Sequence, residues 1–282
     1  MKKLLINLFL IFGVLAIAQN KRFIYEYKFI SDSTNVDDVK TEMMFLDTTK
    51  DGSKYYSYTV FNSDSIMKVD LEKQLAATGS INVKSDMRKG NVRYSVTKTY
   101  PDYKINLHRR LGMDSYNISD DRKINWKISS EKEKIGEWNV QKAEADFAGR
   151  HWIAWFSNDI PIQDGPYKFH GLPGLIVKIE DKTGSHKLEL KGIKNNAAER
   201  NILISEWEKP ISIDYKKYQT VYRNYRKDPI ANFKKKIQDG EAYITDDTGD
   251  KISSPDYMKS MERQALESMK KNNNILELEL LR

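Results

Sequence analysis

The chain contains no cysteine among its 282 residues. This absence excludes disulfide bonds, thiolate metal sites and cysteine nucleophiles together. Stability must therefore come from a buried core. A chain of this length can bury roughly three quarters of the surface that its unfolded form exposes, so we expect an ordinary hydrophobic core without covalent crosslinks.

Beyond residue 18 the chain also lacks any apolar run long enough to span a bilayer. The run Leu4–Ala18 follows Met1-Lys2-Lys3 and ends in Ala16-Ile17-Ala18, and these are the three parts of a secretory signal peptide. A membrane anchor is the alternative, but the run of about 15 residues is shorter than the ~20 needed to cross. We expect an exported protein, periplasmic or extracellular, cleaved after Ala18. Its mature part has no transmembrane segment, although it could still associate with a membrane surface.

The sequence lacks the short motifs of the common enzyme classes. It has no G-x-S-x-G, no H-E-x-x-H, no phosphate-binding loop and no dinucleotide-binding glycine pattern. No pair of its histidines stands at metal-ligand spacing, so we expect no metal and no cofactor; the histidines are His108, His151, His170 and His186. The formal charge of +7 is moderate and predicts no nucleic-acid partner. Because carboxylate enzymes leave no short motif, these absences favour a non-catalytic protein but keep a hydrolase as the alternative.

Short alternating segments are abundant instead. Large apolar residues two positions apart begin at Phe23, and the same period recurs up to residue 193 with polar turns such as Lys50-Asp51-Gly52. This pattern favours an antiparallel meander over βαβ units. The pattern also predicts a strand over Tyr55–Asn62. The polar stretch Ser63–Gly90 is expected to be a loop with one short helix near Lys68–Ala76.

After residue 195 the pattern changes to that of helices. Four tyrosines recur at helical spacing within Asp214–Lys227, where we expect them to pack against the protein while the basic residues between them face solvent. We therefore predict a mainly β (α+β) fold: a curved antiparallel sheet or half-open barrel with C-terminal helices packed against it. Neither a repeat nor a linker interrupts residues 19–282, which we expect to form one domain, β-rich over 21–193 and helical over 212–272.

Residues 149–179 hold three of the seven prolines and four of the fourteen glycines. The segment Arg150–Ser157 has large apolar side chains on both faces, which is typical of a strand in the middle of a sheet. The chain should leave the sheet at Pro161, because proline has no N–H to donate to a neighbouring strand. Pro173-Gly174 fits a type II turn, in which Gly174 would supply the positive φ. A second apolar strand follows from Leu175.

The same segment resembles the signature of the GLPGLI family, which comprises exported proteins found mainly in Bacteroidetes. The core of the resemblance is Gly165-Pro166-Tyr167-Lys168-Phe169-His170-Gly171-Leu172-Pro173-Gly174-Leu175-Ile176. Further matches are Trp126, Ile135-Gly136, Lys142-Ala143, Phe147, Gly149-Arg150, Trp155, Asp159-Ile160-Pro161 and Asn272-Asn273-Asn274, although the proline expected near the last of these is missing. The family has no established reaction, so the resemblance implies a fold unit and no particular chemistry.

We take as candidate binding residues those of this loop and of the strand that leads into it. They are Arg150, Trp152, Trp155, Asp159, Pro161, Gly165, Pro166, Phe169, His170, Gly171, Leu172, Pro173 and Gly174. The aromatic residues could line a ligand cavity, but ordinary core is the commoner role of such side chains. Arg150 and Asp159 flank the strand, and we expect an ion pair between them that fixes the exit of the loop.

Apolar strands next to a rigid loop favour a binding function. The leading hypothesis is a non-catalytic cell-envelope protein that binds a hydrophobic small molecule, or an extended segment of an envelope protein, at residues 159–174. One alternative is an envelope hydrolase that uses carboxylate or histidine groups near His170. The other is an accessory subunit of an outer-membrane transporter.

Overall fold

The computed structural model describes all residues except 1–19, 80–87, 196–208, 241–242, 246–250 and 253–254. The expected signal peptide, residues 1–18, therefore lies outside the described residues. No helix in the described part of the chain is both long and apolar enough to cross a membrane.

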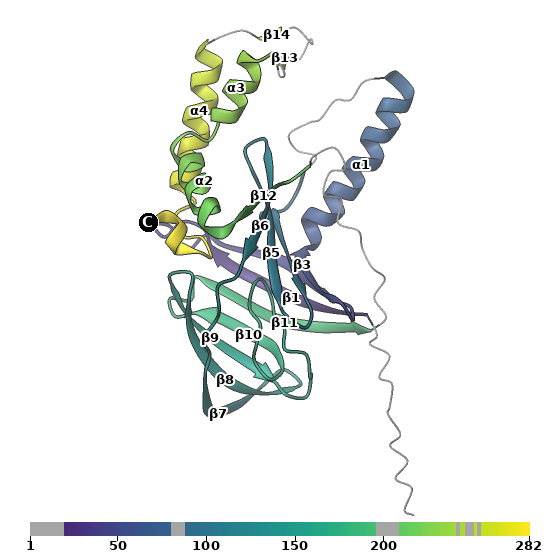
Figure 1. Ribbon diagram of the computed structural model, residues 1–282, viewed down its shortest axis with the longest axis vertical. Helices are drawn as coiled ribbons and strands as arrows, with labels where there is room; N and C mark the ends of the chain where they lie inside the picture. The colour runs from purple at the N-terminus through teal and green to yellow at the C-terminus, as the bar shows by residue number, and fades with distance from the viewer. Residues whose placement is uncertain (1–19, 80–87, 196–208, 241–242, 246–250, 253–254) are drawn as a thin grey trace, which may run out of the picture.

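One curved sheet of twelve strands forms the body of the described chain (Figure 1). Its strands are β1 (Lys21–Ile30), β2 (Val39–Thr48), β3 (Gly52–Ser57), β4 (Tyr94–Thr99), β5 (Lys104–Leu111), β6 (Asp114–Asp120), β7 (Lys127–Ile135), β8 (Trp138–Phe147), β9 (Arg150–Ser157), β10 (Leu175–Asp181), β11 (His186–Asn195) and β12 (Ile211–Asp214). Their spatial order is β12-β6-β5-β4-β3-β2-β1-β11-β10-β9-β8-β7. Two meanders, β1 to β6 and β7 to β11, are thus joined where β1 pairs with β11.

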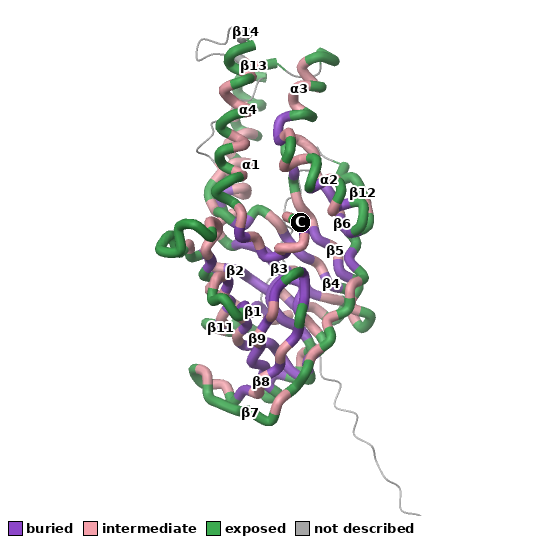
Figure 2. The backbone as a smooth tube through the Cα atoms, turned by 90° about the vertical axis from the view of Figure 1, so that its left-hand side faces the viewer, coloured by how far each residue is buried: buried purple, intermediate pink, exposed green. Residues whose placement is uncertain are grey.

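The helices and a short ribbon lie outside this sheet. They are α1 (Tyr58–Thr78), α2 (Tyr215–Lys227), α3 (Ala231–Gln238), α4 (Pro255–Lys270), the 3-10 turn η1 (Leu278–Leu281), and the pair β13 (Ile244–Thr245) and β14 (Lys251–Ile252). Asp214 begins α2 by accepting a hydrogen bond from the N–H of Lys217 at 2.7 Å. Figure 2 shows that α1 and α4 project away from the buried body and are mostly exposed or half-buried.

The predicted fold class is confirmed. The sheet is open, all its neighbouring strands are antiparallel except the parallel pair β6 and β12, and the helices pack against it. The predicted middle position of β9 is also confirmed, because β9 pairs with both β8 and β10. The tyrosines of α2 pack as expected: Tyr215, Tyr218 and Tyr222 are buried.

The strand expected over Tyr55–Asn62 is wrong beyond Ser57. The Oγ of Ser57 accepts a hydrogen bond from the N–H of Val60 at 3.1 Å and begins α1 at Tyr58. The short helix expected near Lys68–Ala76 is therefore part of a helix of 21 residues. The aromatic and β-branched residues that follow Ser57 favour a strand by propensity, but the cap decides in favour of a helix.

Candidate functional site

The signature loop (residues 158–174) connects β9 to β10 and lies between the two halves of the sheet. The ring of Phe169 packs edge-on against Trp152 of β9, with centroids 4.7 Å apart. From the other half, Lys98 of β4 donates a hydrogen bond to the carbonyl oxygen of Phe169 at 3.3 Å. Residues 164–169 are all buried. This central part of the loop therefore belongs to the core rather than to the surface.

The type II turn predicted at Pro173-Gly174 is wrong, because Gly174 does not have a positive φ. Space, not backbone conformation, requires glycine here: a Cβ at Gly174 would lie 2.1 Å from the carbonyl oxygen of Ser157. The left-handed residues of the loop are Tyr167, with φ 55°, and Gly171, with φ 89°.

The ammonium group of Lys98 holds the loop from β4. Its Nζ lies 2.5 Å from Oδ1 of Asp164 and donates to the carbonyl oxygens of Gly165 at 2.6 Å and Tyr167 at 3.0 Å. The other oxygen of Asp164 accepts from the hydroxyl of Tyr100 at 2.5 Å. Both charged side chains are fully buried. Such a pair is expensive to desolvate, and the surrounding hydrogen bonds satisfy its remaining donors and acceptors.

A second buried cation, Lys168, ties the loop to β6 and to the end of the chain. Its Nζ lies 2.7 Å from Oδ2 of Asp120 and is also paired with Glu277. Arg122 contacts Asp120 through Nη2 at 2.6 Å, and the hydroxyl of Tyr215 donates to Glu277 at 2.5 Å. Burial alone would raise the pKa of Asp120, but the hydrogen bonds and charges of Arg122 and Lys168 outweigh it and hold the pKa at about 2.

The expected ion pair between Arg150 and Asp159 is wrong. Arg150 instead contacts Asp181 at 2.9 Å, the side-chain oxygen of Asn274 at 2.5 Å and the carbonyl oxygen of Ile275 at 2.7 Å. Arg150 and Asp159 stand at opposite ends of β9, and a strand of this length separates its ends by roughly 25 Å. Arg150 is therefore a buried anchor for the C-terminal segment (residues 272–280).

The aromatic candidates take the ordinary role of core side chains. Trp152, Trp155 and Phe169 are buried in the main hydrophobic cluster, and Trp126 packs against it while donating to the carbonyl oxygen of His170 at 2.8 Å. Among the other candidates, Gly165, Pro166, Leu172 and Gly174 are buried, whereas Asp159, Pro161, Gly171 and Pro173 are exposed at the surface.

His170 does not face a free carboxylate. Its Nδ1 lies 2.9 Å from the carbonyl oxygen of Lys168, its ring stacks on Tyr103 with centroids 4.9 Å apart, and burial lowers its pKa. Asp164, which forms a backbone bridge with His170, is already occupied by Lys98. Among the described residues no group of three or more potential metal ligands is found.

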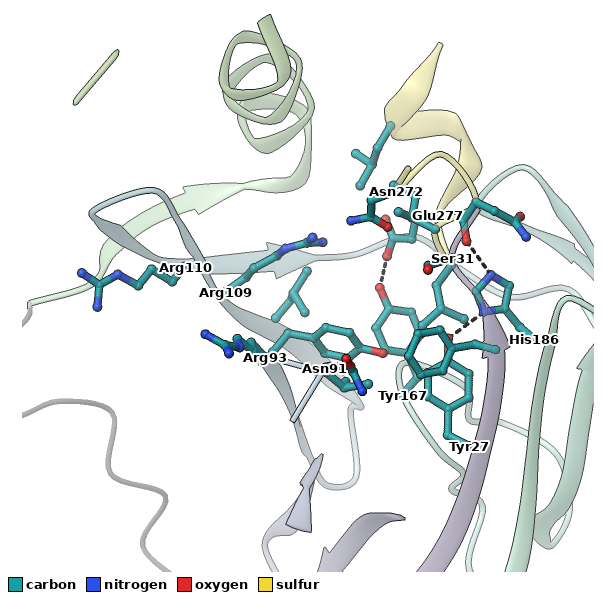
Figure 3. Close-up of a pocket in the computed structure, with 18 residues that line it drawn as sticks. Tyr27, Ser31, Asn91, Arg93, Arg109, Arg110, Tyr167, His186, Asn272 and Glu277 are labelled. Atoms are coloured by element: carbon teal, nitrogen blue, oxygen red, sulfur yellow. Dashed lines mark hydrogen bonds between the residues drawn. The ribbon is translucent and has the colours of Figure 1, made fainter. Parts of the chain in front are cut away.

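A pocket of about 200 Å³ opens beside the signature loop, between the inner face of the sheet and the C-terminal segment (Figure 3). Its aromatic wall consists of Tyr27, Phe29, Tyr94 and Tyr167. The polar and charged residues of its lining are Ser31, Asn91, Arg93, Arg109, Arg110, His186, Asn272, Asn274 and Glu277. The loop thus forms one wall of this pocket through Tyr167.

One side of this pocket is electrically neutral. The hydroxyl of Tyr27 lies 2.6 Å from Nδ1 of His186, and Nε2 of the same ring lies 3.0 Å from the carbonyl oxygen of Asn274. Burial, and next the charge of Arg150, lower the pKa of His186 to about 3. The imidazole is therefore uncharged at neutral pH and acts as a hydrogen-bonding spacer between β1 and the C-terminal segment.

None of the thirteen candidate residues predicted from the sequence lines this pocket. The lining comes from segments that are widely separated in the chain, and no local pattern brings these segments together. Two signals did point there: Tyr167 lies inside the signature, and Asn272-Asn273-Asn274 forms part of the family resemblance. Both belong to the lining or adjoin it.

Comparison with known proteins gives a family match and a fold match. A family model described as "Protein of unknown function (Porph_ging)" matches residues 148–178, which span β9, the signature loop and most of β10. No curated protein matches the chain. Two solved structures of PNGF-II, in space groups C2 and P21, each superpose with a TM-score of 0.52 at 17% identity. They cover 74% of this chain but 34% of PNGF-II, so this chain spans about a third of that protein, and at such identity the likeness concerns the fold alone.

Proposed function

We propose that this chain is an exported cell-envelope protein that binds a small ligand, or the end of a partner segment, in the pocket beside the signature loop, without catalysis. The observation that carries the proposal is the pocket, about 200 Å³ in volume and lined by aromatic and arginine side chains. Small-molecule sites are usually preformed and largely apolar, with a few polar groups that fix orientation. Export is inferred from residues 1–18 of the sequence.

The signature loop has a supporting role in this proposal. Its buried part is held by Lys98 and Lys168, and it offers Tyr167 to the pocket. Its exposed residues include a carboxylate, two prolines and a glycine, which lie at separate places along the loop. In this proposal the loop contributes one wall of the site through Tyr167.

The state of the carboxylates supports binding over hydrolysis. Asp120 and Glu277 share Lys168, and Asp164 is held by Lys98. A general base must be able to accept a proton from a substrate within hydrogen-bond distance. Burial alone would raise the pKa of Asp120 and Glu277, but the neighbouring cations lower it, and a carboxylate with a lowered pKa is a poor base.

The direct test is native mass spectrometry of the protein purified from its own host without denaturation. Asn91 is an exposed residue whose side chain lines the pocket, so Asn91→Trp should block the pocket with little effect on the fold. Asn158→Trp is the matched control on the exposed surface of the signature loop.

We expect a copurified small molecule or peptide on the wild type and on Asn158→Trp, and none on Asn91→Trp. A wild-type protein that carries no additional mass and binds no envelope extract would contradict the proposal. Loss of the ligand only in Asn158→Trp would place the site on the outer surface of the loop instead.

A further inference from the structure

Arg109 lines the pocket and has unused hydrogen-bond donors. Its only hydrogen bond with another described residue is the one that Nη1 donates to the hydroxyl of Tyr218 at 3.3 Å, and its guanidinium lies 5.1 Å from the ring centroid of Tyr222. A guanidinium has five N–H donors. Figure 3 shows the side chain extending from β5 toward the C-terminal segment, whereas Arg110 points away.

The other arginines with well-covered side chains are satisfied differently. Arg22 contacts Asp47 at 2.6 Å, Arg122 contacts Asp120 at 2.6 Å, and Arg150 contacts Asp181 at 2.9 Å. In the described part of the chain, Arg109 makes no such ion pair. A partly covered guanidinium without a carboxylate on a pocket wall is what a site for an anionic ligand requires.

A second unsatisfied group belongs to the same pocket. The hydroxyl of Tyr94 is buried and has no hydrogen-bond partner among the described residues. Burial raises the pKa of this hydroxyl and the charge of Arg109 opposes that rise, so the two groups act on each other. Buried polar groups normally have partners, and an orphaned one in a pocket indicates that a ligand or water supplies the missing partner.

We propose that the ligand of this pocket carries a carboxylate, which binds the guanidinium of Arg109 and the hydroxyl of Tyr94. The inference rests on the proposed binding function and names its ligand class. The planar fork of arginine suits a carboxylate, and the aromatic wall suits a flat or short aliphatic body.

The test compares a carboxylate with its neutral isostere. Binding of 2-naphthoate and of 2-naphthamide is measured by calorimetry on the full protein. The pair N-acetylphenylalanine and N-acetylphenylalanine amide repeats the comparison for the end of a peptide chain. We expect at least one of the two acids to bind about tenfold or more tightly than its amide, which corresponds to one ion-paired hydrogen bond.

Arg109→Gln should reduce this preference to about onefold to twofold, and Tyr94→Phe should reduce it by a smaller factor. Arg223→Gln is the matched control, because Arg223 is exposed on α2 and does not line the pocket, and it should keep the preference. Arg109→Lys keeps the positive charge and should retain part of the preference for the acid. Thermal unfolding of each variant without probe separates a lost site from a lost fold.

The outcomes distinguish the inference from the proposed function. If acid and amide bind equally, and Asn91→Trp abolishes both, the pocket is a binding site but the carboxylate inference is wrong. Binding of an acid that does not depend on Arg109 also overturns it. If none of the four probes binds at millimolar concentration, the inference is overturned, whereas the proposed function is decided by the mass spectrometry of the native protein.

Discussion

The two regions of the molecule that bury cations differ in how those cations are neutralised. Beneath the signature loop, Lys98 and Lys168 are fully buried and lie 2.5 and 2.7 Å from carboxylate oxygens. In the pocket, Arg109 has one neutral tyrosine hydroxyl at 3.3 Å. Removing Lys98 leaves the buried carboxylate of Asp164 without its cation, whereas removing Arg109 leaves no described carboxylate unpaired. We infer that the first region holds the fold and the second is free to bind.

The largest expected effect is in the first region. Lys98→Met should lower the free energy of unfolding by about 3–5 kcal/mol, because it leaves the buried carboxylate of Asp164 unpaired. Urea denaturation followed by circular dichroism measures the change. The double variant Lys98→Met/Asp164→Leu should recover part of the loss. A single-variant loss below about 1 kcal/mol would mean that the ion pair does not hold the loop.

Acid should weaken the tie between β1 and the C-terminal segment. The pKa of His186 is lowered to about 3 in the folded chain, chiefly by burial, against about 6.5 when unfolded. The unfolded chain therefore takes up the proton first. The contribution of His186 to the free energy of unfolding is fully present above pH 6.5. It falls as the pH drops toward 3, at up to about 1.4 kcal/mol per pH unit.

The measurement is urea denaturation at pH 7, 6, 5 and 4.5 for the wild type and for His186→Gln. The groups that face this imidazole are Tyr27, Arg150, Asp181 and Asn274. The variant should lose stability overall but show a flatter pH dependence in this interval. Equal slopes for the two proteins would show that His186 does not carry the effect.

The exit of the loop offers a smaller, steric test. Gly174→Ala should cost about 1–3 kcal/mol, because its Cβ would meet the backbone of Ser157. Gly184→Ala is the matched control: Gly184 has φ 71° with nothing within 4 Å of the Cβ that alanine would add, so it should cost about 1 kcal/mol from backbone strain alone. The melting temperatures of the two variants show which substitution destabilises the protein more. A larger cost at Gly184 would contradict the close approach of β9 and the loop.

The smallest effect on stability is expected in the pocket. Arg109→Gln should change the free energy of unfolding by less than about 1 kcal/mol, because its only described hydrogen bond is long and goes to a neutral hydroxyl. Its effect should appear in ligand binding instead. A loss as large as that of Lys98→Met would remove the distinction between the two regions.

The sequence predicted what depends on local periodicity. The apolar alternation from Phe23, the apolar faces of Arg150–Ser157 and the tyrosine spacing of α2 all led to elements that the structure contains. The polar edge strand β7 has no apolar face that a sequence pattern could detect, because it is exposed over most of its length. The start of α1 was also not predicted. The residues after Ser57 favour a strand by propensity, but in the structure Ser57 caps a helix.

The candidate site was harder to predict, because it depends on contacts between distant residues. Gly174 was recognised as special for the wrong reason, since its neighbour Ser157 is close only in the folded chain. Arg150 was recognised as an ion-pair former, but its partner Asp181 is brought near by strand pairing. No sequence pattern singled out Arg109. What distinguishes it is that it forms no ion pair with a carboxylate among the described residues, and this can be seen only in the folded chain.

The C-terminal segment has a consequence for the order in which the protein can acquire its structure. Asn274 donates to the carbonyl oxygen of Ile30 at 2.9 Å, across 244 positions of the chain, and Glu277 neutralises Lys168. During synthesis Asn274 and Glu277 emerge long after β1, so these two contacts can form only once the end of the chain has been made. Contacts of such high sequence separation also form slowly. The C-terminal segment is therefore among the last parts of the chain to reach its native contacts.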